Sequence, residues 1–113
     1  MIDIYYLKST RLYEVYMEYI NFIAKHTFEA IARRHHLSVE EVELRLQNNI
    51  QRGIHHSDEA IRNSWRKIPC QGKEPTPEEL FDYLVDEHGG WNEANAFWIS
   101  MELGEMVLEE DET

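Results

Sequence analysis

Residues 27–52 read TFEAIARRHHLSVEEVELRLQNNIQR, and this stretch predicts two helices joined by a tight turn. Ile31 closes the inner face of the first helix, and Leu37 is the apolar residue at the corner. Val42 and Leu46 stand four residues apart, which is the spacing of an inward stripe on the second helix. The pattern therefore predicts a compact pair of helices at the centre of the chain.

The start of the second helix is marked by a capping signal. Ser38 precedes the helix and Glu41 follows three residues later, which is the spacing of a capping box. A helix, a short turn and a capped second helix are typical of the helix-turn-helix, whose second helix enters the major groove of DNA. We therefore expect a helix-turn-helix over residues 28–52, with the helix from Val39 as its reading helix.

A DNA-reading role assigns specific residues. Amide side chains pair with adenine, and basic side chains and helix-start amides hold phosphates. The expected base-reading residues are Gln47 and Asn48. The expected phosphate contacts are Arg33, Arg34, Ser38 and Arg52, supplemented by Arg62, Arg66, Lys67 and Lys73.

The reading helix is unusually acidic for this role. Glu40, Glu41 and Glu43 crowd the end that normally approaches DNA, where phosphates would repel their carboxylates. The sequence therefore leaves two functions open, namely binding of double-stranded DNA and contact with a protein on the same helical scaffold.

Charge is distributed unevenly along the chain. The net charge is −11, yet residues 24–73 carry nine Lys or Arg against six Asp or Glu. After Lys73 there are thirteen acids and no Lys or Arg. Such asymmetry within one chain indicates nucleic-acid contact or an acidic terminal segment.

Length and cysteine content indicate the class of protein. A chain of 113 residues is expected to form a single domain, 1–113, with one modest core. The single cysteine, Cys70, excludes an internal disulfide and fits a reducing compartment. No apolar run approaches the length of a membrane span. We expect a cytoplasmic protein that does not contact membranes.

Periodicity predicts an all-α fold of about six helices. No alternating strand pattern is present, and Thr76, Pro77 and Glu79 mark one further helix start. Gly53 is expected to end the third helix, and Ser57 or Asp58 to cap the fourth. The expected helices are 2–22, 23–35, 39–52, a short helix through Ile61 and Trp65, one after Thr76, and an additional acidic helix over 91–108, followed by a frayed acidic tail at 109–113.

In the first expected helix, an inner face is predicted from residues spaced three and four apart. These residues are Leu12, Val15, Tyr16, Tyr19, Ile20 and Ile23. The tyrosines are interpreted as aromatic residues of the core and its rim.

No pattern of catalytic or ligand-binding residues appears. The adjacent pairs His35-His36 and His55-His56 diverge by about 100° on a helix, so each pair offers one ligand at most. No nucleophile with its base and no glycine-rich phosphate loop is present. We expect no enzymatic activity, no cofactor and no metal site.

The alternative function involves the last helix. Trp91, Phe97, Trp98 and Met101 lie on an acidic segment that is suited to forming a homodimer or docking on a basic partner protein. The same acidic helix, laid across the chain's own basic surface, would act as an electrostatic cover.

Residues 23 to about 85 resemble the C-terminal DNA-binding effector domain of the sporulation initiation master response regulator. The resemblance is carried by the segment from Phe28 to Arg34, by Glu40, Val42, Glu43 and Ile50, and by Pro75, Thr76, Glu79 and Phe81. It implies an all-helical domain that places a reading helix in a promoter's major groove, usually as a tandem dimer.

This sequence departs from the family pattern at the reading positions. Glu41, Leu44 and Gln47 stand where the family has arginines, and Asn48 stands where it has a histidine. The family's base contacts are therefore not transferred to these positions. The chain contains no receiver domain, so we expect no phosphorylation control from within it, and the helix from Trp91 has no counterpart in the family.

Overall fold

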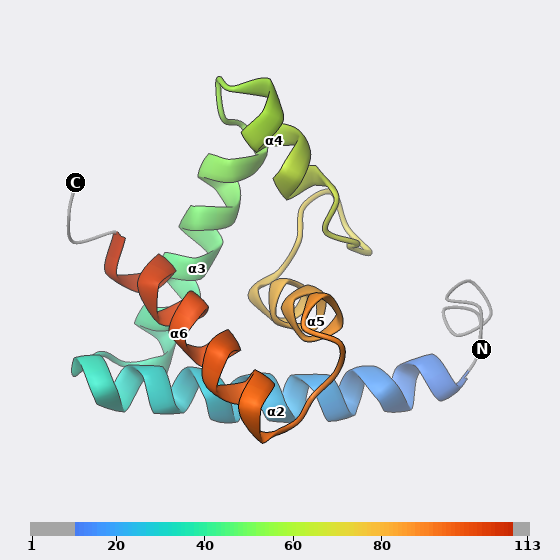
Figure 1. Cartoon of the computed structure of the whole chain (residues 1–113), viewed down its shortest axis with the longest axis vertical. Coiled ribbons are helices and arrows are strands. Elements are labelled where there is room, and N and C mark those ends of the chain that lie inside the picture. The colour runs from blue at the N-terminus through green and yellow to red at the C-terminus, as the bar shows by residue number, and fades with distance from the viewer. Residues whose placement is uncertain (1–10, 110–113) are drawn as a thin grey trace.

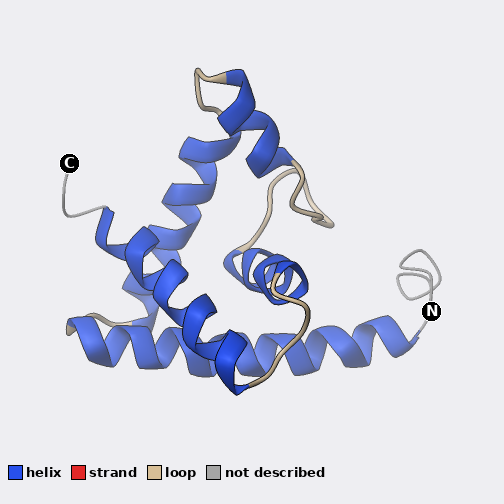
Figure 2. Ribbon diagram, viewed as in Figure 1, coloured by secondary structure: helices blue, strands red, loops and turns tan. Residues whose placement is uncertain are grey.

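The computed structural model describes residues 11–109, and within this range the regular secondary structure is all helix, with no strand (Figure 2). The helices are α2 (Arg11–His35), α3 (Val39–Ile54), α4 (Glu59–Arg66), α5 (Pro77–Glu87) and α6 (Glu93–Glu109). The all-α prediction is confirmed. The parts of the predictions that fall on residues 2–10 and on the acidic tail 110–113 lie outside the described residues.

The expected count of about six helices is not confirmed, because two predicted helices are one. Residues 11–35 form the single helix α2, where a boundary had been expected between residues 22 and 23. No glycine or proline lies within this stretch, so nothing in the local sequence stops the helix. The described residues contain five helices.

A three-residue turn connects α2 to α3. His36 adopts a left-handed backbone conformation, with φ of 58°. The backbone N–H of Leu37 donates to the carbonyl of Ala32 at 2.9 Å, and together these features form a Schellman-type helix end. Ser38 then caps α3, because its Oγ accepts from the backbone N–H of Glu41 at 3.0 Å. The predicted Ser38 cap is confirmed, whereas the predicted helix-turn-helix over residues 28–52 is not confirmed.

Helix α3 lies at the centre of the molecule and contacts all four of the other described helices. In Figure 1, α3 rises from one end of α2, α5 lies in the angle between them, and α6 crosses α2. The core is built from the inner faces of these helices. Its fully buried side chains include Phe28, Ile31, Val42, Leu46, Ile50, Phe81, Ile99, Leu103 and Val107.

Helix α4 packs closely on the end of α3. Gly53 lies inside α3, which continues to Ile54, so the prediction that Gly53 ends the helix is wrong. A Cβ on Gly53 would lie 2.3 Å from the ring of Trp65 on α4. Glycine is therefore needed here for close packing and not for a turn. Asp58 is the cap of α4.

The start of α5 is formed as the sequence predicts. Thr76 and Glu79 make a reciprocal capping box, with Pro77 in the first turn. The side chain of Asp82 on this helix accepts a hydrogen bond from the hydroxyl of Tyr16 at 2.7 Å, which ties α5 to α2.

Helix α6 is an integral part of the core. Its buried residues Ile99, Leu103 and Val107 share one apolar cluster with α2, α3 and α5. Trp91, which had been assigned to the last helix, precedes it and packs on Phe81 with ring centroids 5.4 Å apart. An acidic helix that merely covers a basic surface would not supply fully buried core residues, so α6 is not a detachable cover.

Candidate functional site

The residues predicted to contact DNA lie at four places along α2 and α3. Arg33 and Arg34 are in the last turn of α2, and Ser38 is the cap of α3. Gln47 and Asn48 lie in the middle of α3, and Arg52 is in its last turn. From Ser38 to Arg52 the helix rises about 20 Å. The structure thus spreads these residues from the last turn of α2 along the whole length of α3.

Several of these residues are occupied by contacts within the chain. Arg34 donates from Nη2 to the backbone oxygen and Oγ of Ser100 on α6, at 3.4 and 3.3 Å. Gln47 donates from Nε2 to the carbonyl of Pro75 at 3.2 Å. Arg52 donates to the side-chain oxygen of Asn49 at 3.0 Å. If these side chains contact DNA, each has to break or share its contact within the chain in order to reach a base or a phosphate.

The outward stripe of α3 is narrow. Glu40, Leu44 and Arg52 are exposed, and Asn48 between them is half-buried. Leu44, with 54% of its surface exposed, is the apolar residue at the middle of this stripe. The stripe therefore presents one acid, one leucine, one amide and one arginine to solvent.

The surface beside the first half of α3 is acidic. A hollow of about 930 Å³ lies between α2, α3 and the start of α5, and among the described residues that line it Lys25 is the one basic residue. Burial raises the pKa of Glu43 there, and the nearby carboxylates of Glu78 and Glu40 raise it further, while Lys25 lowers it. The carboxylates lining the hollow are Glu14, Glu18, Glu43, Glu74, Glu78 and Glu79. This charge repels a phosphate backbone.

Two of the additional basic residues donate hydrogen bonds to carbonyl groups at the C-terminal end of α3. Arg62 donates to the carbonyl of His56 at 2.9 Å, and Arg66 donates to the carbonyl of Ile54 at 3.2 Å. Guanidinium groups satisfy carbonyls at a helix C-terminus and interact favourably with its dipole. Their contacts thus stabilise the join between α3 and α4.

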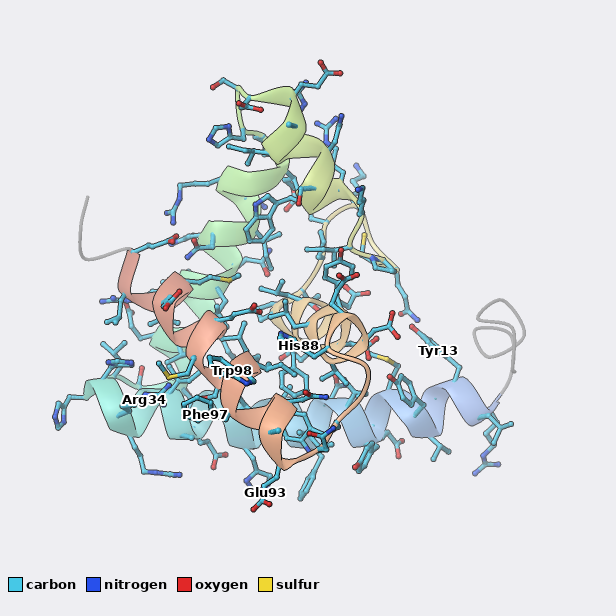
Figure 3. The ribbon with its side chains drawn as sticks, viewed as in Figure 1. Tyr13, Arg34, His88, Glu93, Phe97 and Trp98 are labelled. Carbon is cyan, nitrogen blue, oxygen red and sulfur yellow. The ribbon has the colours of Figure 1, made fainter. Side chains whose placement is uncertain are left out.

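A different surface has the character of a docking site. Phe97 and Trp98 on α6 are 57% and 58% exposed, and their rings touch edge to face with centroids 5.2 Å apart. Met101 follows on the same helix and is also exposed. We call these three residues the α6 face, and Figure 3 shows Phe97 and Trp98 where α6 crosses α2, near Arg34.

The α6 face continues onto α2. A groove of about 340 Å³ between the two helices is lined by His26, Ala30 and Phe97 among others. The ring of His26 meets the ring of Phe22 at 4.6 Å, and Phe22 is 64% exposed. An apolar surface of large exposed aromatics therefore spans two helices, which is the kind of patch that marks an interaction site.

Sequence reasoning found only part of this surface. It identified Phe97, Trp98 and Met101, but it placed Leu12, Val15 and Tyr19 on an inner face. All three are exposed, because the core side of α2 runs through Ile20, Ala24 and Phe28 instead. The sequence did contain a signal for the exposed side of α2, namely a second apolar stripe whose residues are spaced alternately three and four apart.

Two observations concern other classes of site. Among residues 11–109, no group of three His, Cys, Asp or Glu side chains is placed to hold a metal ion. No helix in the same range is both long and apolar enough to cross a bilayer.

Comparisons with protein-family profiles, with curated proteins and with solved structures find no match for this chain. The resemblance to the sporulation regulator's effector domain therefore stays a prediction from the residues quoted above.

Proposed function

We propose that this protein is a non-enzymatic regulatory module that acts by binding another protein through the α6 face and the adjoining side of α2. The observation that carries the proposal is the exposure of Phe22, Phe97 and Trp98, each more than half accessible. Phe97 lines the groove between α2 and α6, and the other two adjoin it through ring contacts, Phe22 with His26 and Trp98 with Phe97. Aromatic side chains bury large areas at low entropic cost and are enriched among the residues that dominate protein interfaces.

The charge around this surface defines the partner's chemistry. Helix α6 carries several carboxylates, and no Lys or Arg follows Lys73 in the chain. A partner that meets the α6 face is expected to present apolar side chains inside a basic rim, because complementary charge favours association and orientation. The acids of α6 are Glu93, Glu102, Glu105 and Glu109.

The test uses a photo-crosslinking amino acid placed at Trp98, with the same amino acid at Ile61 as control. Ile61 is also exposed but lies on α4, away from the α6 face. We expect protein adducts in the native cell from position 98 and not from position 61. Adducts at neither position, or the same adducts at both, would remove the proposal.

A second candidate is binding of double-stranded DNA by α3, in a transcription-regulatory role. It is favoured by the capped helix that follows a three-residue turn and by the exposed stripe that includes Arg52. In this case Gln47 and Asn48 read bases, and the residues that hold phosphates are Arg33, Arg34, Ser38 and Arg52.

A gel shift at about 50 mM salt tests DNA binding, because phosphate contacts are strongest at low salt. If α3 reads DNA, Asn48→Ala should weaken binding to a specific site, and Arg52→Ala should weaken binding to all sequences. No shift of promoter fragments at micromolar protein would discard this candidate.

A further inference from the structure

The side of α2 that faces away from α3 and α5 carries an apolar repeat of its own. Four of its residues are more than half exposed, at 55%, 55%, 55% and 64% in chain order, and the fifth is an exposed histidine. Figure 1 shows α3 and α5 on the same side of α2, and the exposure of these residues indicates that neither helix covers them. We call these residues the outer seam: Leu12, Val15, Tyr19, Phe22 and His26.

The spacing of the outer seam is that of a coiled coil. Its residues follow one another at intervals of three, four, three and four, which are the a and d positions of two heptads. A surface helix of a single domain needs one apolar stripe, and α2 already buries one through Ile20, Ala24 and Phe28. A second stripe at heptad spacing indicates a second helical partner.

Charges beside the outer seam indicate which helix this partner is. Glu18 and Lys25 are exposed and seven residues apart, so both flank the seam on the same side. If two α2 helices pair antiparallel with Tyr19 of each beside Phe22 of the other, Glu18 of each lies next to Lys25 of the other. The two-fold symmetry forms this ion pair twice, whereas a parallel pairing would set Glu18 and Lys25 against the uncharged Ile23 and Ala30.

We propose that a second copy of this chain binds the outer seam of α2 as an antiparallel, two-fold symmetric helix pair. The inference rests on the proposed function that the protein acts through protein contacts, and it names a partner for the α2 side of that surface. The interface is isologous, so each copy contributes the same residues.

The groove between α2 and α6 extends this interface. In the antiparallel pairing, the partner's Leu12 comes level with residues 29 and 30 of α2. Ala30 and Phe97 line the groove at this point. The pairing therefore brings an apolar side chain to the mouth of an apolar groove, and it joins the outer seam to the α6 face in one continuous surface.

Sedimentation equilibrium of the full chain between about 1 µM and 1 mM tests the proposal. We expect the mass to rise with concentration from 13.5 kDa to twice that value. Phe22→Glu should keep the protein monomeric over the whole range, because it buries two carboxylates at the centre of the helix pair. Leu44→Glu, at a leucine on α3 that is also more than half exposed, is the matched control and should leave dimerisation unchanged.

A charge swap tests the antiparallel arrangement. Glu18→Lys and Lys25→Glu should each weaken the dimer by roughly tenfold, because each turns two attractive pairs into two repulsive ones. The double variant should restore the wild-type affinity. Melting curves at 1 µM check that the monomer is intact, since Lys25 also lies within electrostatic reach of Glu43.

Three results would overturn the inference: a monomer at all concentrations, a dimer that survives Phe22→Glu, or charge swaps that do not rescue each other. If the protein is monomeric and Phe22→Glu lowers its melting temperature, another part of the same chain covers the outer seam. This result also overturns the inference. If the chain is monomeric while position 98 still crosslinks to another protein, this inference fails and the proposed function stands.

Discussion

Helices α2 and α3 meet at one corner, yet they present opposite kinds of surface. Helix α3 packs against every other described helix, and its outward stripe is narrow, with Glu40, Leu44 and Arg52 exposed. Helix α2 buries one side and leaves a full heptad seam of leucine, valine and aromatic residues in solvent. The local sequence predicts α3 as the recognition helix, yet α3 lies at the centre of the fold. Its neighbour α2 carries the larger exposed apolar surface.

The largest expected effect separates the two sides of α2. Phe28→Ala should destabilise the fold by about 3–5 kcal/mol, because Phe28 is fully buried and packs on Phe81. Phe22→Ala on the outer seam should change the stability of the dilute monomer by less than about 0.5 kcal/mol. Denaturant unfolding at 1 µM measures both. Equal losses would mean that the outer seam is covered within the monomer.

The close packing of α3 is probed at Gly53. Gly53→Ala should lower stability by about 1–3 kcal/mol, because the added Cβ would lie 2.3 Å from the ring of Trp65. Gly72→Ala is the control, since nothing lies within 4 Å of its Cβ position. Thermal unfolding of both variants makes the comparison, and a neutral Gly53→Ala would show that α4 is free to shift away from α3.

The corner between the two helices is expected to gain from a glycine. His36 has φ of 58°, a conformation that costs a side-chain-bearing residue about 1 kcal/mol. His36→Gly should therefore raise stability by up to about 1 kcal/mol, whereas Arg33→Gly, at an exposed position inside α2, should lower it by a similar amount. Chemical denaturation of the two variants checks the opposite signs, and a loss in both would assign His36 a stabilising contact.

The smallest effect concerns the contact of α2 with α5. Burial raises the pKa of Asp82 above its usual 3.8, the hydrogen bond from Tyr16 lowers it, and repulsion from Asp86 and Glu79 raises it, with a net upward shift. The folded state thus holds this proton more tightly than the unfolded state, so ionising Asp82 costs stability above its usual pKa. Asp82→Asn should raise the melting temperature at pH 7 by a few degrees.

This gain should shrink as the pH falls towards 3, where the carboxyl is protonated in both states. Differential scanning calorimetry at pH 7 and pH 3 measures the change. A lower melting temperature for Asp82→Asn at pH 7 would show that the Tyr16 hydrogen bond needs the ionised carboxylate.

Local signals in the sequence predicted the helix starts well. Ser38 and Thr76 cap their helices where the sequence places them, and Asp58 is one of the two caps that the sequence allowed, because a cap depends on the next three residues alone. The same locality explains the error at Gly53. Its role depends on Trp65, twelve residues away, and no pattern within α3 reports that contact.

The outer seam shows the limit of periodicity. Leu12, Val15 and Tyr19 and the truly buried Ile20 all satisfy helical spacing, so α2 has two apolar stripes and the sequence does not say which one the core covers. The candidate DNA contacts were predicted from residue type, and that reasoning had no access to the contacts of Arg34 with Ser100 and of Gln47 with Pro75.

The contrast between α2 and α3 is tested most directly by placing one photo-crosslinking amino acid at Phe22 and, in a separate variant, at Leu44. Both positions are more than half exposed, so both are accessible to a partner. We predict protein adducts, including a second copy of this chain, from position 22 and none from position 44. Nucleic-acid adducts from position 44, with no protein adduct from position 22, would contradict the assignment of recognition to α2.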